Sequence, residues 1–202
     1  TLGGAVEQNR DSRHSEDVDD VEAVRATLAG DHDAFARIVD RYTPVIYSLA
    51  VRYLGREQEA EDAVQEVFLR AFDALDRFHL SRRFYSWLYT IAVNHLRNVR
   101  NKRRRRGSDD ALPYEDRVAS DEVQRSLADP PSELERTEGE AMVRSALARL
   151  KPKHRDVLIL RQFQGLPVAD VAEILDLPEG TVKTNLHRAK KALADILSRE
   201  DV

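Results

Sequence analysis

The sequence predicts an all-α protein made of two small helical domains joined by a flexible acidic linker, with a helix-turn-helix in the C-terminal domain. Apolar residues recur at helical spacing over about residues 21–99, and no stretch shows the alternation typical of strands. Helical spacing returns near residue 141, after an acidic stretch that contains three prolines. We therefore expect a disordered acidic tail at 1–20, a first domain at 21–106, the linker at 107–140 and a second domain at 141–202.

Three helical stretches account for the first domain. One spans about residues 31–55, where Gly55 is expected to end the helix and Pro44 to kink or split it. A second follows within "EQEAEDAVQEVFLRAFDALDRF", and a third begins at about Phe84. Each has one apolar stripe, so the three helices are expected to share a core.

Charge is distributed in blocks along the chain, although the formal net charge is only −4. Residues 97–106 carry seven basic side chains and no acid, whereas residues 107–140 carry eleven acids and three bases. The absence of cysteine excludes disulfides and thiolate metal sites and suits a reducing compartment. No apolar run approaches the roughly 20 residues of a membrane span, and no signal-peptide layout is present, so we expect a cytoplasmic protein without membrane insertion.

The basic block follows an aromatic segment, "FYSWLYTIAVNHLRN", which contains Phe84, Tyr85, Trp87 and Tyr89. These rings cannot all face one core, and for Trp87 the alternative is a position wholly within the core. Aromatic rings beside a cationic track suit single-stranded nucleic acid, because bases stack on rings while phosphates follow the charges. Taken alone, the basic block would be read as a solvated helix end or a localisation signal.

The sharpest motif is "LPVADVAEILDLPEGTVKTNLHRAKKALADIL", which has the layout of a helix-turn-helix. Pro178 suits the first position of its second helix, and Gly180 leaves the backbone open near that helix N-terminus. Polar donors on exposed or flanking faces of this helix are suited to reading the major groove. They are Lys183, Thr184, Asn185, His187, Arg188, Lys190 and Lys191. The alternative is a helical hairpin with a solvated basic face.

A third feature is the acidic helix "AEDAVQEVFLRAF". With its apolar stripe turned inward, Leu69 lies among acids on the outer surface, which suggests a protein-binding patch. A plain solvated face is the competing interpretation.

The three features, in this order and separation, resemble bacterial sigma factors of the extracytoplasmic-function group, and the envelope-stress members in particular. The resemblance covers about residues 31–106 and 141–197. It implies that the chain binds core RNA polymerase, recognises −35 and −10 promoter elements, melts promoter DNA and initiates transcription of a stress-type regulon. It also implies contacts with the β′ clamp coiled coil and the β-flap tip, and control by an anti-sigma factor.

The resemblance assigns roles to residues by their positions in the matching segments. The residues implied to bind core polymerase are Asp62, Gln65, Glu66 and Leu69. Those implied to bind the −10 element or single-stranded DNA are Phe78, Arg82, Arg83, Phe84, Tyr85, Trp87, Asn94, Arg97 and Arg100. Those implied to bind the −35 element are Thr181, Lys183, Thr184, Asn185, His187, Arg188 and Lys191. We expect no cofactor and no metal.

Two other classes of protein are less consistent with the sequence. The phosphate-binding, zinc-protease and cysteine-nucleophile motifs of common enzymes are absent, so we expect no enzyme. A stand-alone DNA-binding regulator would need a receiver or ligand domain in its first half, but residues 31–106 lack the alternating β/α pattern of a receiver. We also expect the acidic linker to discourage DNA binding by the free chain.

Overall fold

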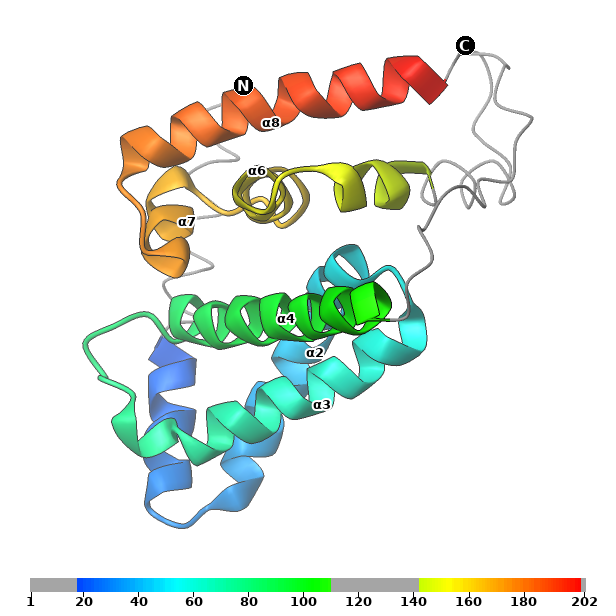
Figure 1. Cartoon of the computed structure of the whole chain (residues 1–202). Helices are drawn as coiled ribbons and strands as arrows, with labels where there is room; N and C mark the ends of the chain where they lie inside the picture. Colours follow the sequence, from blue (N-terminus) through cyan, green and yellow to red (C-terminus); the bar gives the residue numbers. More distant parts are fainter. Residues whose placement is uncertain (1–17, 110–141, 201–202) are drawn as a thin grey trace, which may run out of the picture.

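The computed structural model of the 202-residue chain describes residues 18–109 and 142–200 (Figure 1). The expected tail, apart from 18–20, and the expected linker, apart from 107–109, lie outside the described residues. Every regular element within the described ranges is a helix, as predicted. None of these helices is long and apolar enough to cross a membrane, and no acid–histidine group among them could hold a metal ion. The described elements, in chain order, are a helix over 18–28, α2 (His32–Leu54), α3 (Glu57–Asp73), the 3-10 turn η1 (Leu75–Arg77), α4 (Phe84–Asp109), a helix over 142–149, α6 (Pro152–Leu158), the π-helical turn η2 (Ile159–Phe163), α7 (Val168–Leu175) and α8 (Glu179–Glu200).

Helices α2, α3 and α4 pack against one another and form the core of the first domain. The N-cap of α2 is Asp31, whose carboxylate accepts hydrogen bonds from the backbone N–H groups of Asp33 and Ala34 at 3.1 and 3.3 Å. The helix over 18–28 joins this domain through Asp20, which is buried and accepts hydrogen bonds from Arg41 and Tyr42 of α2. Residues 18–20 are therefore helical, which corrects the expectation of a disordered tail up to residue 20.

Pro44 was expected to kink or split its helix, and the structure excludes the split, because α2 runs unbroken from His32 to Leu54. Pro44 has no N–H, so the Asp40 carbonyl, four residues earlier, lacks its helical hydrogen bond. Both residues are exposed, so water can satisfy that carbonyl. The Thr43 hydroxyl donates to the Val39 carbonyl at 2.7 Å, which adds a bond in the same turn.

Gly55 ends α2 as predicted, with a φ of +76° and its N–H bonded to the Val51 carbonyl at 2.8 Å. Replacing Gly55 with alanine is expected to lower the free energy of unfolding by about 1 kcal/mol, because an L side chain is strained in this conformation. Urea unfolding followed by circular dichroism measures this change. Gly180→Ala is the matched control, since a Cβ there meets nothing within 4 Å and φ is not positive. Equal stability of the two variants would contradict the cap assignment.

The second domain is built from the helix over 142–149 and from α6 to α8, and contains the predicted helix-turn-helix. The chain leaves η2 at Gly165, where φ is +67°, and leaves α7 at Asp176, where φ is +53°. Pro178 lies immediately before α8 rather than at its first position, and its carbonyl accepts the N–H groups of Thr181 and Val182 at 2.9 and 3.1 Å. Pro178 is therefore the N-cap residue of α8, whereas the sequence predicted that it would occupy the first helical position.

The two domains contact each other directly, which the sequence did not predict. Figure 1 shows α7 lying over the start of α4, and α8 on the opposite side of the second domain. The η2 turn contacts α2 as well, and the largest cluster of buried apolar residues includes residues from both domains. The first domain consequently presents one face of α4 to its own C-terminal domain rather than to solvent.

Candidate nucleic-acid and polymerase interface

The outer face of α3 is the acidic surface expected from the sequence. Its inward residues are buried, whereas Asp62 and Gln65 are exposed and Leu69 is 61% exposed. Glu66 is half-buried and forms an ion pair with Arg70 at 2.7 Å, one helical turn along. An exposed leucine between acidic and amide side chains is a feature of protein-binding surfaces, since it offers apolar area inside a polar rim.

Two aromatic residues expected to contact DNA are instead part of the core. Phe84 has no exposed surface and Phe78 is only 5% exposed. Their rings lie 5.4 Å apart at an angle of 84°, and Trp87 packs on both rings at 5.2 and 5.5 Å. Phe78 and Phe84, which the resemblance implies to be DNA-binding, are therefore buried in the core and have no exposed ring face for an unstacked base in this structure. Trp87 is half-buried, so it lies at the border between the core and the surface.

The arginines and the tyrosine at the start of α4 remain accessible on the surface. Arg82 and Arg83 are exposed, and Tyr85 is half-buried with its hydroxyl 3.2 Å from a guanidinium nitrogen of Arg83. Burial, followed by a hydrogen bond to Asp170, raises the pKa of Tyr85 to about 12. A neutral ring next to two permanent cations is a suitable contact for a base and its flanking phosphates.

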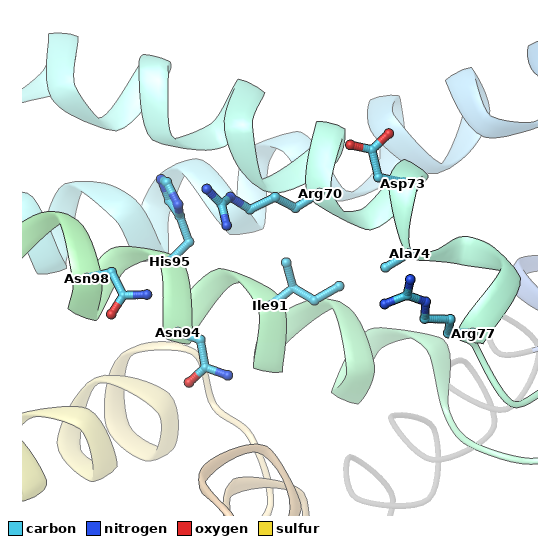
Figure 2. A pocket seen from close by; sticks show the side chains of 8 residues that line it. All are labelled: Arg70, Asp73, Ala74, Arg77, Ile91, Asn94, His95 and Asn98. Atoms are coloured by element: carbon cyan, nitrogen blue, oxygen red, sulfur yellow. The ribbon is translucent and has the colours of Figure 1, made fainter.

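The middle of α4 carries Asn94, Arg97 and Arg100, but the structure does not bring them to one surface. Asn94 is exposed and lines an open depression of about 470 Å³ between α3 and α4 (Figure 2). Arg97 and Arg100 are half-buried against the second domain. Burial, with the nearby charge of Arg155 as the next cause, lowers the pKa of Arg100 to about 10.

Figure 2 shows that the depression on the α3 side of α4 is lined by further basic and amide groups. Arg70 and His95 lie next to each other, and Arg77 projects into the other end. Burial, together with the charge of Arg70, lowers the pKa of His95, so its imidazole is neutral near pH 7. Sequence reasoning did not select Arg70, Arg77 or His95, because they are dispersed over three elements, α3, η1 and α4.

Helix α8 exposes most of the residues expected to bind the −35 element. Thr181, Lys183, Thr184, His187, Arg188 and Lys191 are all exposed. Asn185 is the exception, because it is only 5% exposed, which corrects the expectation that it lies on an exposed or flanking face. It lines a depression of about 390 Å³ with Thr181, Thr184 and Arg188.

Four polar residues of the second domain contact the first, and none was singled out from the sequence. Asp156 and Asp170 are 2% and 3% exposed, and they pair with Arg97 and Arg83. Glu173 pairs with Arg82, and Gln164 bonds to Tyr89. The sequence does contain a signal for Asp170, which is an acid on an otherwise apolar stripe between Val168 and Val171. The local sequence does not indicate which residue pairs with it.

Two family profiles match the chain, one to each domain. The profile described as Sigma-70 region 2 matches residues 38–106, and that described as Sigma-70, region 4 matches residues 140–193. Together they define the class: a protein with the two DNA- and polymerase-directed regions of sigma-70-type factors, the second of which contains the helix-turn-helix.

Curated relatives narrow this class. The chain is 36% identical over 177 residues to the ECF RNA polymerase sigma factor SigW of Bacillus subtilis, covering 84% of this chain and 92% of SigW. It is 35% identical over 182 residues to the ECF RNA polymerase sigma-E factor of Escherichia coli, covering 89% of this chain and 94% of that one. The chain belongs to the ECF family of RNA polymerase sigma factors, which are transcription initiation factors, and its partners are core RNA polymerase and promoter DNA.

Solved structures agree on the fold. CnrH, in a structure with the cytosolic domain of CnrY, has a TM-score of 0.64 at 24% identity, covering 90% of this chain and 98% of CnrH. RpoE of Bartonella quintana, in a co-crystal structure with the anti-sigma factor NepR, has a TM-score of 0.61 at 24% identity, covering 81% of this chain and 96% of RpoE.

Proposed function

We propose that the chain docks on core RNA polymerase through the outer face of α3, reads the −35 element with α8, and holds the −10 element and its separated strand with α4 and the loop before it. The observation that carries this proposal is the pairing of both sigma regions in one chain, with an exposed Leu69 on one surface and exposed donors on α8. We propose further that the chain acts in the cytoplasm, as is expected of a partner of RNA polymerase.

Reading of the −35 element by α8 follows from the exposure of its donors. Lys183 and Arg188 can donate to guanine acceptors, and Thr184 can contact several bases. Thr181, close to the helix N-terminus, suits a phosphate contact, because free N–H groups and the helix dipole favour an anion there. His187 and Lys191 lie further along the helix, where they suit backbone contacts.

Strand separation at the −10 element needs binding energy rather than chemistry. Extruding a base costs a few kcal/mol, which contacts made only with the open strand must offset. Arg82 and Arg83 supply cations beside Tyr85, and Asn94 offers an amide on the exposed side of α4. The basic end of α4, including exposed Lys102, Arg104 and Arg105, adds sequence-independent attraction for phosphates.

Replacing Leu69 with aspartate is expected to weaken binding to core polymerase by at least about 30-fold. The change removes apolar contact area and puts a charge in the middle of the interface. Biolayer interferometry with immobilised core enzyme measures the affinity. Leu80→Asp is the matched control, because Leu80 is also exposed, at 39%, but lies outside α3. Equal affinities for the two variants would refute the docking face, and unchanged melting temperatures would exclude a folding defect.

We further propose that an anti-sigma factor controls the chain. The support comes from the neighbours in structure, since CnrH was solved with the cytosolic domain of CnrY and RpoE with the anti-sigma factor NepR. We propose separately that residues 153–163, in α6 and η2, dock on the β-flap tip of the polymerase. For the regulon we propose a stress-type set of genes, in line with the SigW and sigma-E relatives.

In-vitro transcription with core polymerase and a library of promoter sequences tests the function as a whole. We expect the chain to yield transcripts from a subset of promoters, and those promoters to share two elements at a fixed separation. The chain without core enzyme is expected to bind the same promoters weakly. Tight and specific binding by the chain alone, with no transcription after core enzyme is added, would instead identify a stand-alone regulator.

A further inference from the structure

The basic end of α4, residues 100–106, extends beyond the apolar core of the first domain. Val99 is the last apolar side chain of α4 that packs against the core, and the residues that follow it up to 106 are five arginines, one lysine and one asparagine. Like charges three or four residues apart on a helix repel one another and destabilise it. This end therefore needs contacts with the rest of the domain to stay helical and to keep its direction.

Arg103 makes such a contact with the ends of the two neighbouring helices. One of its guanidinium nitrogens, Nη1, lies 3.3 Å from the Leu54 carbonyl oxygen and 3.4 Å from Oε2 of Glu59. Leu54 is the last residue of α2, so its carbonyl has no donor within the helix and lies at the negative end of the helix dipole. Glu59 belongs to the first turn of α3. A single arginine thus links the end of α2, the start of α3 and the basic end of α4.

Glu59 is itself held in place for this contact. It pairs with Arg56 at 3.3 Å, and its position in the first turn of α3 favours an acid, because a helix N-terminus carries partial positive charge. The Glu59 side chain is only 30% exposed, so its ion pairs are partly shielded from water. Among the described residues, no carboxylate pairs with the exposed cations of this end, which are Lys102, Arg104 and Arg105. Glu59 thus fixes the basic end at one point without pairing with its exposed cations.

We propose that Arg103 is a positioning residue: with Glu59 and the Leu54 carbonyl, it fixes the direction of the basic end of α4 and leaves the three exposed cations of that end available for DNA phosphates. The proposal rests on the proposed function, in which these cations attract the promoter backbone. It adds Arg103 and Glu59 to the residues on which DNA binding depends, although neither side chain contacts the DNA.

The positioning role predicts an effect of Glu59 that is opposite in sign to the effect of its charge. An acid near a DNA-binding surface repels phosphates, so its removal ordinarily strengthens DNA binding. Loss of the Glu59 charge instead removes one of the two partners of Arg103, so the basic end is in its binding position for a smaller fraction of the time. The apparent affinity for DNA falls in proportion to that fraction.

The test measures binding of the free full-length chain to a fluorescein-labelled, mixed-sequence single strand of about 12 nucleotides by fluorescence anisotropy at low salt. Glu59→Gln, which keeps the shape of the side chain, is expected to weaken binding by about threefold or more. Glu57→Gln is the matched control, because it removes the same charge from an exposed position in the same turn of α3, and it should leave the affinity unchanged or raise it. Equal affinities of the two variants, or tighter binding by Glu59→Gln than by wild type, would overturn the proposal.

A double-mutant cycle tests whether the effect of Glu59 passes through Arg103. Arg103→Ala alone is expected to weaken binding by about fivefold or more. In the Arg103→Ala background, Glu59→Gln should no longer weaken binding, because the contact between the two side chains is already absent. Circular dichroism verifies that each variant is folded. An equal loss of affinity from Glu59→Gln in both backgrounds would overturn the positioning role.

Two further measurements separate the inference from the function on which it rests. Hydrogen exchange of the backbone amides over 101–106 is expected to be faster in Glu59→Gln than in Glu57→Gln, and equal exchange would overturn the positioning role. The Arg104→Ala, Arg105→Ala double variant is expected to bind the strand about tenfold more weakly, with a salt dependence reduced by about 1.4 in the log–log slope. If this double variant binds as tightly as wild type, the assignment of the basic end to DNA fails and the inference fails with it. If it binds weakly while Glu59→Gln binds normally, that assignment stands and the inference alone is overturned.

Discussion

Replacing Phe84 with alanine is expected to lower the free energy of unfolding by about 3–5 kcal/mol. Phe84 has no exposed surface, and its ring packs against Tyr42, Phe78 and Trp87 with centroids 5.4–5.8 Å away. Truncation removes these contacts and leaves a cavity between α2 and α4 that the aromatic neighbours can fill only in part. Urea unfolding of the full chain, followed by circular dichroism, measures the loss.

Phe72→Ala is the matched control for this prediction. Phe72 is also an aromatic residue of the first domain, but it is 39% exposed and contacts only the edge of the core, with its ring 5.1 Å from Phe35. We expect it to cost less than about 1.5 kcal/mol. If Phe84→Ala instead left stability near wild type and lowered affinity for single-stranded DNA, the ring would be a base platform, as the sequence first suggested.

The helices and their inward faces were largely predictable from the sequence, because both depend on local spacing. The α3 stripe of Val64, Val67 and Phe68 is buried and Leu69 projects outward, as the helical period requires. The end of α2 at Gly55 and the break at Gly165 follow from the conformational freedom of glycine. The helical period thus determines which face of α3 is buried, and the residue type determines where these helices end.

Side chains at the borders of the apolar stripes were not predictable in this way. The start of α4 has an aromatic residue at four of its first six positions, and spacing alone does not decide which rings point inward. The loop before α4 brings Phe78 back onto Phe84, a contact that depends on the path of the chain rather than on the helical period. Asn185 falls on the buried side of α8 together with Val182 and Ala189, where a polar residue is the exception.

The interface between the domains could not be predicted from the sequence, for a different reason. Its members are far apart in the chain, as with Arg83 and Asp170, and pair only because the domains are docked. An arginine in a basic segment is equally consistent with a role as a DNA ligand and with a role as the ion-pair partner of an acid. Only the three-dimensional arrangement shows that Arg97 reaches a buried carboxylate on α6.

That carboxylate, Asp156, is the site of the second large effect. Asp156→Asn is expected to lower the free energy of unfolding by about 3–5 kcal/mol. The side chain is 2% exposed and lies between two cations, Arg97 at 2.9 Å and Arg155 at 3.8 Å. Arg155 is itself only 3% exposed, and burial lowers its pKa while the charge of Asp156 opposes that shift. An amide of the same shape would leave the buried guanidinium without its compensating charge.

Asp195→Asn removes the same charge from an exposed position on α8 and is expected to change stability by less than about 0.5 kcal/mol. Thermal and urea unfolding of both variants measure the difference, and because asparagine is isosteric with aspartate the comparison is free of a cavity contribution. If Asp156→Asn were as mild as the control, Arg155 would have to be satisfied by the Tyr53 ring, 5.7 Å from its guanidinium carbon, rather than by the carboxylate. A double variant that adds Arg155→Met is expected to recover much of the lost stability, since an apolar chain of similar length needs no counter-charge in that position.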